Sequence, residues 1–135
     1  MEVLKSETLP VRSSEDVVTV RTSVRKMAAE LRFGIVDQTK IVTAASEIAR
    51  NTIDYGAGGD LRMDAVSNGL KKGLRLVFAD RGPGIRDLAQ AMTDGFSSGN
   101  GMGLGLGGTR RLMDEFDIAS KLNEGTTVTI TKWSR

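Results

Sequence analysis

The stretch Gly101-Met-Gly-Leu-Gly-Leu-Gly-Gly108, followed by Thr109-Arg110-Arg111-Leu112-Met113, is the most informative part of this 135-residue chain. Its five glycines in eight positions let the backbone adopt positive φ angles and approach a ligand closely. Apolar residues at three-to-four spacing predict a helix over residues 104–116. A glycine-rich loop that leads into a helix directs free N–H groups and the positive end of the helix dipole at one point, which favours a phosphate ligand.

Three other interpretations of this glycine stretch are weaker. Flexible linkers are usually mixtures of glycine and serine, whereas here glycine alternates with methionine and leucine. A P-loop is excluded because no lysine followed by serine or threonine comes after the glycines. Gly103, Gly105 and Gly108 do fit the dinucleotide pattern G-x-G-x-x-G, but that pattern follows a hydrophobic strand directly, and residues 93–100 do not form one.

Length and composition narrow the possible functions. The length predicts one domain, and the absence of cysteine and histidine excludes thiol nucleophiles, thiolate metal sites, a Ser-His-Asp triad and a phosphohistidine intermediate. A net charge of only +2 and 4% aromatic residues disfavour nucleic-acid binding. No apolar run approaches the length of a membrane span, and the first residues lack a signal-peptide core, so we expect a cytoplasmic protein.

The pattern of apolar residues predicts an α+β fold. We expect a two-layer sandwich in which helices cover one face of a mixed, mostly antiparallel sheet. The predicted helices cover residues 14–33, 37–55 and 104–116, and the predicted strands cover residues 3–11, 61–66, 74–79, 118–122 and 126–132. On the first helix, Arg21, Arg25 and Lys26 lie outside the apolar stripe and form either a docking face or an ordinary solvated surface.

The second predicted helix carries a polar stripe beside its apolar face. Glu47, Asn51 and Asp54 recur at i, i+4 and i+7, so they share one edge of the helix. A glutamate there is able to accept a proton or to hold a metal through water, and an asparagine is able to give an oxygen ligand to Mg²⁺. When Glu47 is considered alone, a solvated helix edge explains it better than a functional role.

A second glycine motif, Asp80-Arg-Gly-Pro-Gly-Ile85, follows the most apolar predicted strand. An aspartate at a strand end is able to accept a hydrogen bond from an exocyclic amine, and Gly82 and Gly84 allow a base to lie against the backbone. The alternative is a turn that contains proline and glycine, which is common between structural elements.

These motifs, in this order, resemble those of the GHKL ATPase/kinase superfamily, whose ATP-binding domain is the Bergerat fold. Glu47-x-x-x-Asn51 is similar to its N box, and Asp80-x-Gly-x-Gly84 and Gly101-x-Gly-x-Gly105 to its two glycine boxes. Gly125-Thr126 resembles its last nucleotide contact. The resemblance implies that Asp80 binds the adenine amine, that Asn51 holds Mg²⁺, and that residues 81–105 form a lid over the phosphates of ATP.

The resemblance thus implies a complete site. Its cofactors are ATP and Mg²⁺, and Glu47 would orient or deprotonate the hydroxyl that receives the phosphoryl group. The implied nucleotide contacts are Asn51, Asp54, Asp80, Gly82, Gly84, Ile85, Gly101, Met102, Gly103, Leu104, Gly105, Leu106, Gly107 and Thr126.

Within the superfamily, the chain resembles the RsbT-type switch kinases, which are small bacterial serine/threonine kinases of the stressosome. Ser46-Glu-Ile-Ala-Arg-Asn51, Asp94-Gly-Phe-Ser97, Arg111-Leu-Met-Asp-Glu-Phe116 and Lys132-Trp-Ser-Arg135 carry this likeness. It implies that the substrates are STAS-domain proteins of the RsbS and RsbR kinds. It also implies that the released kinase activates an RsbU-like PP2C phosphatase. A homodimer is an oligomeric state that the sequence leaves open.

Departures from the superfamily pattern keep some alternatives open. Ser97-Ser-Gly-Asn100 stands where anti-sigma-factor kinases carry a Glu-Arg pair, which disfavours direct binding of a sigma factor. Asp54 occupies a position that is often basic, so Arg50, Arg81 or Arg110 would have to supply the phosphate charge. The main rival function is an ATP-dependent partner-switching module with negligible catalysis. An ATP-driven conformational machine is disfavoured because it would need further domains.

Overall fold

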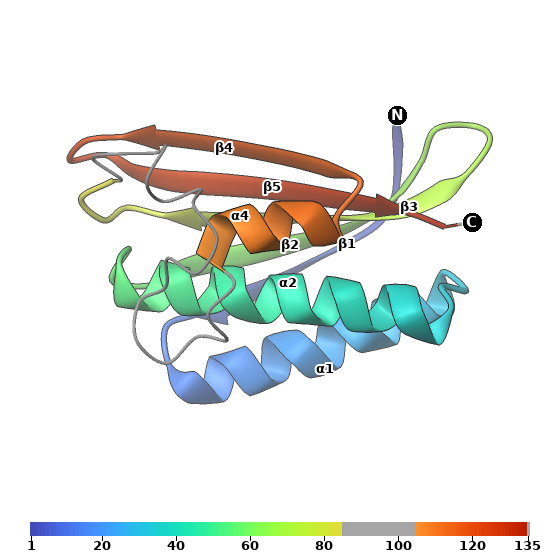
Figure 1. The fold of residues 1–135 in the computed structure, drawn as a ribbon, viewed down its shortest axis with the longest axis horizontal. Helices are drawn as coiled ribbons and strands as arrows, with labels where there is room; N and C mark the ends of the chain where they lie inside the picture. Colours follow the sequence, from blue (N-terminus) through green and yellow to red (C-terminus); the bar gives the residue numbers. More distant parts are fainter. Residues whose placement is uncertain (85–104, 135) are drawn as a thin grey trace.

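The computed structural model describes residues 1–84 and 105–134, and within them helices lie on one face of a single sheet (Figure 1). The strands are β1 (Glu2–Val11), β2 (Gly59–Ser67), β3 (Lys72–Asp80), β4 (Glu115–Lys121) and β5 (Gly125–Trp133). The helices are α1 (Ser14–Glu30), α2 (Ile35–Asp54) and α4 (Gly105–Leu112). This arrangement confirms the predicted α+β sandwich.

The five strands form one sheet in the order β1-β2-β3-β5-β4, which places β3 at its centre. Every pairing between described strands is antiparallel, so the parallel part of the predicted mixed sheet is not found in the described residues. Side chains alternate between the two faces, and Leu61, Met63, Leu74, Leu76 and Ile130 are completely buried. They form the sheet side of the core.

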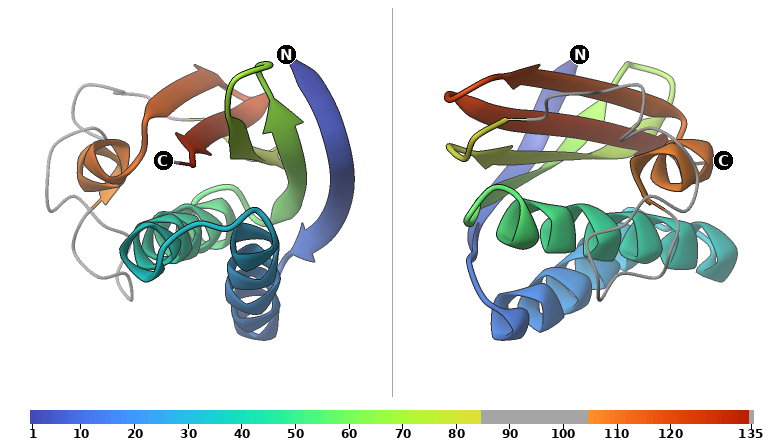
Figure 2. Two further views of the ribbon diagram at one scale, coloured as in Figure 1. Left: turned by 90° about the vertical axis from the view of Figure 1, so that its right-hand side faces the viewer. Right: turned by 60° about the vertical axis from the view of Figure 1, so that its left-hand side comes forward.

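Helices α1 and α2 form the second layer, and both follow their apolar stripes. Ser13 caps α1 by accepting a hydrogen bond from the Asp16 backbone N–H. The second helix begins at Ile35, two residues before the predicted start, and ends at Asp54. The two helices lie side by side against the sheet (Figure 2), and their valines, alanines and isoleucines complete the core.

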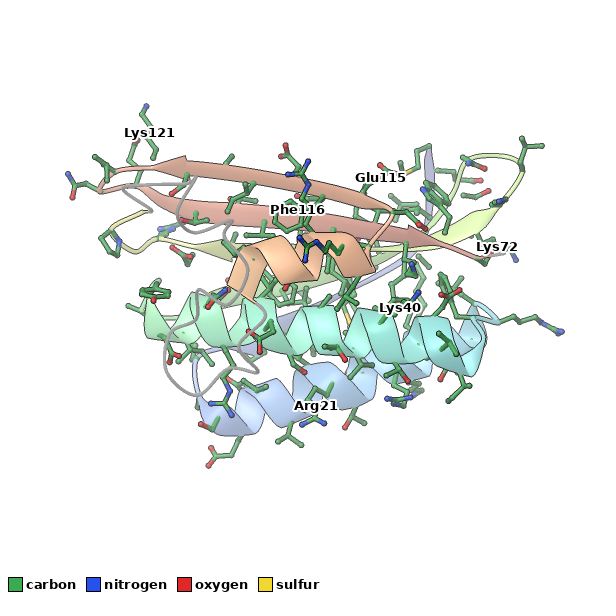
Figure 3. All side chains as sticks on the ribbon, viewed as in Figure 1. Arg21, Lys40, Lys72, Glu115, Phe116 and Lys121 are labelled. Atoms are coloured by element: carbon green, nitrogen blue, oxygen red, sulfur yellow. The ribbon has the colours of Figure 1, made fainter. Side chains whose placement is uncertain are left out.

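Helix α4 packs beside α2 and is shorter than predicted. It ends at Leu112, whereas the sequence predicted a helix through Phe116. The Asp114 backbone N–H donates to the Thr131 carbonyl at 3.0 Å, and this bond starts the pairing of β4 with β5. Phe116 therefore belongs to β4, and its side chain still projects toward α4 (Figure 3) and packs against the core. The apolar spacing was correct, but strand pairing overrides it.

The face of the sheet opposite the helices contains a buried carboxylate. Asp64 is only 2% exposed, and its Oδ2 accepts hydrogen bonds from Arg75 at 2.8 and 3.2 Å and from Arg62 at 3.2 Å. Ser6 donates to its Oδ1 at 2.7 Å. Burial alone would raise the pKa of Asp64, but these hydrogen bonds outweigh it and hold the pKa below its usual range.

The described helices are too short or too polar to cross a membrane.

Candidate nucleotide site

Asp80 stands at the end of the central strand β3, as predicted, and its carboxylate is held from two directions. Its Oδ1 accepts a hydrogen bond from the Gly82 backbone N–H at 2.8 Å and a second from the Thr126 backbone N–H at 3.2 Å. The first bond fixes the turn after β3, and the second ties that turn to the start of β5. Within the described residues, no donor is bound to Oδ2, which leaves this oxygen available to accept a hydrogen bond from a ligand.

Glycines surround this carboxylate, because no side chain would fit there. A Cβ on Gly56 would overlap the Asp80 carboxyl group, and a Cβ on Gly82 would lie 2.6 Å from the Gly56 Cα. Gly125 has a φ of +112°, and a Cβ there would overlap the Asp80 carbonyl oxygen. The end of α2, the end of β3 and the start of β5 thus meet at bare backbone. Glycine at these positions lets the three segments pack closely around Asp80.

The turn that contains Gly82 and Gly84 rests on the β4–β5 hairpin. The Asn123 backbone N–H donates to the Pro83 carbonyl at 2.8 Å. Gly84 has a φ of +80°, and a Cβ there would lie 2.5 Å from the Lys121 carbonyl oxygen. The side chain of Thr126 is also fixed, since its Oγ1 lies 2.8 Å from the Ser120 Oγ. Residues 81–84 therefore lie on a preformed platform.

Helix α2 carries the predicted polar stripe, but its three members differ in burial. Glu47 is only 1% exposed, Asn51 is half-buried and Asp54 is exposed at the last turn. The sequence predicted that Glu47 lies beside the apolar face of this helix, and the structure places it among the buried residues of α2. A carboxylate in such surroundings is shielded from bulk water, which is a common property of catalytic acids and bases.

Helix α4 and its surroundings anchor the segment that follows the glycine stretch. Leu106 and Thr109 are buried, while Arg110 is exposed. At the end of α4, the Lys132 Nζ donates to the Leu112 carbonyl at 3.1 Å and lies 3.7 Å from Asp114 Oδ1. Lys132 is only 4% exposed, so this buried cation fixes the C-terminus of α4 to β5.

Several predicted site residues lie outside the described residues, and the others fall into separate groups. Those outside are Ile85, Gly101, Met102, Gly103 and Leu104. Asp80, Gly82 and Thr126 come together around one carboxylate, and Gly84 lies in the same turn. Glu47, Asn51 and Asp54 share α2, while Gly105, Leu106 and Gly107 form the first turn of α4.

Gly56 is the residue of this site that sequence reasoning missed. It lies in the glycine cluster that follows α2, and it stands directly against the Asp80 carboxyl group. One local signal points to it, namely a glycine that follows the polar stripe of the acidic helix. Its separation from Asp80 along the chain hides the contact, because only the folded structure brings the two together.

Among the candidate phosphate-binding arginines, Arg50 is half-buried on α2, whereas Arg81 and Arg110 are exposed.

The fold is that of an ATPase domain, and the chain belongs to the histidine kinase-like ATPase domain family, whose profile matches residues 11–132. One relative is the serine/threonine-protein kinase RsbT of Bacillus subtilis strain 168. It is 47% identical over 120 residues, which cover 89% of this chain and 90% of the relative. This likeness confirms the predicted class, a protein serine/threonine kinase of the RsbT type.

A second group of relatives consists of anti-sigma F factors. The factor of Anoxybacillus flavithermus is 30% identical over 124 residues, which cover 88% of this chain and 85% of that protein. The factor of Clostridium beijerinckii is 29% identical over 129 residues, which cover 90% of this chain and 89% of that protein. The family thus includes regulators as well as kinases.

Solved structures confirm the fold. The RsbU and RsbW domains of Rv1364c from Mycobacterium tuberculosis superpose with a TM-score of 0.68 at 24% identity. That match covers 97% of this chain and 33% of the other. The mycobacterial sensor histidine kinase MprB superposes with a TM-score of 0.56 at 18% identity, and the match covers 97% of this chain and 99% of the other.

Proposed function

We propose that this protein transfers the γ-phosphoryl group of ATP to a serine or threonine of STAS-domain stressosome proteins of the RsbS and RsbR kinds. We further propose that the kinase, once released from these substrates, activates an RsbU-like PP2C phosphatase in the cytoplasm. The observation that carries the proposal is the Asp80 carboxylate, whose Oδ1 is held by two backbone N–H groups among glycines while Oδ2 binds no described donor. The likeness to RsbT supports the choice of a kinase.

The geometry around Asp80 suits an adenine base. Its Oδ2 would accept a hydrogen bond from the exocyclic amine, and Gly56 and Gly82 allow the end of α2 and the turn after β3 to pack closely beside this carboxylate. The backbone N–H groups that hold Oδ1 keep the carboxylate oriented before the nucleotide arrives. A carboxylate that is fixed in advance loses little entropy on binding, which favours affinity.

The phosphate end of the site would combine Asn51 with the first turn of α4. Within the described residues, no group of three or more acidic side chains gathers to hold a metal. Mg²⁺ fits this donor set, because it usually takes a few protein ligands and completes its shell with water and substrate phosphates. When bound, it would neutralise phosphate charge, and Asn51 would hold it through the side-chain oxygen. The N–H groups of α4 would stabilise the phosphates.

Glu47 is the residue that we assign to proton transfer. It stands one helical turn before Asn51, so the two side chains project from the same side of α2. The carboxylate would orient the hydroxyl of the substrate and accept its proton as the oxygen attacks the γ-phosphorus. Catalysis of this kind depends mainly on positioning and on neutralisation of charge.

The decisive test is the Glu47→Gln variant, which keeps the shape of the side chain but removes its basicity. We expect transfer of labelled phosphate from ATP to an RsbS-like STAS protein to fall by about 10²–10⁴-fold, the usual contribution of a general base. ATP affinity by calorimetry should change by less than about threefold, because Glu47 has no assigned role in binding.

Glu15→Gln is the matched control, because Glu15 is an exposed acidic residue in the first turn of α1. It should leave transfer, ATP affinity and thermal unfolding unchanged. Full transfer by Glu47→Gln would refute the proposed base. Mapping of the phosphate on the STAS protein by mass spectrometry distinguishes a kinase from a module that binds partners without catalysis, because only the kinase modifies a hydroxyl.

Activation of the phosphatase requires a separate assay. We expect the unmodified chain to raise the activity of an RsbU-like PP2C phosphatase, and excess unphosphorylated STAS protein to suppress this activation by competition. If the chain phosphorylates the STAS protein but never changes phosphatase activity, the substrate part of the proposal stands and the phosphatase part fails.

A further inference from the structure

A groove between α1 and α2 lies outside the nucleotide site. It has a volume of about 560 Å³ and is lined by Val18, Arg21, Thr22, Arg25, Lys26 and Val42. Five of these residues come from one face of α1, since positions 18, 21, 22, 25 and 26 follow helical spacing. The buried stripe of α1 consists of other residues, namely Val17, Val20, Val24, Met27 and Ala28. Figure 3 shows Arg21 on the side of α1 that faces away from the sheet.

The charge of this groove is positive and not compensated locally. Its lining includes three cations, Arg21, Arg25 and Lys26, and no acidic residue. Within residues 1–84 and 105–134, none of these cations forms an ion pair, whereas exposed Lys5 lies 3.5 Å from Glu30 and exposed Lys121 lies 3.1 Å from Glu124. Clustered charges of one sign repel one another and attract an opposite charge. The groove therefore favours an acidic ligand.

The groove also has an apolar component. Val18 is 61% exposed, which leaves most of a branched aliphatic side chain in water on a helix that otherwise buries its valines. Val42 contributes from α2 and is 6% exposed. A ligand that covers Val18 would remove apolar surface from water, which is favourable. The combination of apolar residues with flanking cations matches an amphipathic helix better than a phosphate or a nucleic acid.

We propose that this groove binds an acidic amphipathic helix of a protein partner. The apolar residues of that helix would pack on Val18 and Val42, and its aspartates or glutamates would pair with Arg21 and Arg25. The surface is distinct from the residues around Asp80, so this docking does not depend on the proposed transfer reaction. It gives the protein a second place at which to hold a partner.

The test uses the full chain and a fluorescent helical peptide as the probe. The peptide carries leucines at i, i+3, i+4 and i+7, with glutamates on both sides of that stripe. We expect saturable binding by fluorescence anisotropy that weakens as salt is added. The double variant Arg21→Glu/Arg25→Glu should bind about tenfold more weakly, since two attractive pairs become repulsive. Val18→Ser should cause a smaller loss that does not depend on salt.

Lys71→Glu/Lys72→Glu is the matched control, because it makes the same change in net charge at exposed positions in and beside the β2–β3 turn. It should change peptide affinity by less than about twofold. The proposal is overturned if the peptide does not bind, if a scrambled peptide of the same composition binds equally well, or if the control variant loses as much affinity as the groove variant. Tighter binding of duplex DNA than of the peptide at this groove would also overturn it. Failure here leaves ATP-dependent transfer to a STAS protein intact, so the two proposals fail separately.

Discussion

Asp64 and Asp80 lie on the neighbouring strands β2 and β3, yet their carboxylates are satisfied in opposite ways. Asp64 is surrounded by cationic and hydroxyl side chains, and each of its oxygens accepts a hydrogen bond from the protein. Asp80 is surrounded by glycines and backbone N–H groups, and only its Oδ1 accepts hydrogen bonds from described residues. Complete pairing is typical of a structural ion cluster, whereas incomplete pairing at bare backbone is typical of a binding site.

The largest effect that we expect comes from Asp64→Ala. The substitution removes the common partner of Arg62 and Arg75 and should lower the free energy of unfolding by about 3 kcal/mol, the lower end for a broken buried pair, because both arginines still reach water. The midpoint of thermal unfolding should fall by roughly 10 °C. ATP affinity, measured below that midpoint, should stay unchanged.

The exposed pair Lys121–Glu124 provides the control for this substitution. Glu124→Ala should cost less than about 0.5 kcal/mol, because an exposed ion pair contributes little. Equal losses of unfolding free energy for Asp64→Ala and Glu124→Ala would show that burial does not increase the contribution of the Asp64 cluster to stability.

Asp80→Asn should have the opposite effect to Asp64→Ala, because it should weaken ATP binding and leave stability nearly unchanged. The amide keeps an oxygen for the Gly82 and Thr126 N–H groups, but places an NH₂ group where the adenine amine would donate. Losing a hydrogen bond to a charged group costs about 2 kcal/mol, so ATP affinity should fall about 30-fold by calorimetry. The thermal midpoint should move by less than about 3 °C. Unchanged affinity would remove Asp80 from the proposed nucleotide site.

These two aspartates also show how far the sequence alone predicts the molecule. Asp80 was predicted because the apolar strand before it and the glycines after it are neighbours in the sequence. The burial of Asp64 is not predictable in this way, because an aspartate in an alternating strand is usually exposed. Its burial depends on Ser6, 58 residues away, and on Arg75, 11 residues away. Such a cluster exists only after β1, β2 and β3 have paired.

The other elements also divide into features set by neighbouring residues, which the sequence predicts, and features set by distant residues, which it does not. The apolar stripes of α1 and α2 are local, and the predicted bounds of both helices were correct to within a few residues. The end of α4 depends on Thr131 and Lys132 from a later strand, so the predicted helix ran too far. Likewise, the burial of Glu47 depends on tertiary packing, because its periodicity predicted only that it would lie beside the apolar face.

Gly56→Ala is expected to have a smaller effect than either aspartate substitution. It tests whether Asp80 binds ATP only when the backbone beside it carries no side chain. The new methyl group would overlap the Asp80 carboxyl group and force it to shift. ATP affinity should fall about tenfold, with a loss of about 1 kcal/mol in stability from overpacking. Gly34→Ala is the control, because Gly34 has a φ of −65° and a Cβ there meets nothing within 4 Å. If both variants bind ATP as the unmodified chain does, the space around Asp80 is not required.

The smallest expected effect is a change of stability with pH that is caused by the protonation of Asp64. Hydrogen bonds from Ser6, Arg75 and Arg62 outweigh the effect of burial and lower its pKa in the folded state. The folded protein therefore releases this proton more readily than the unfolded chain, whose aspartates have a pKa of about 3.9. The resulting stability is fully present above the unfolded pKa and is lost as the pH falls through the folded pKa. The stability advantage of the unmodified chain over Asp64→Asn, measured by urea unfolding, should thus shrink as the pH is lowered below about 4. Other titrating groups are common to both chains and cancel in this difference, so an advantage that stays constant with pH would mean that the cations hold Asp64 equally well in its protonated form.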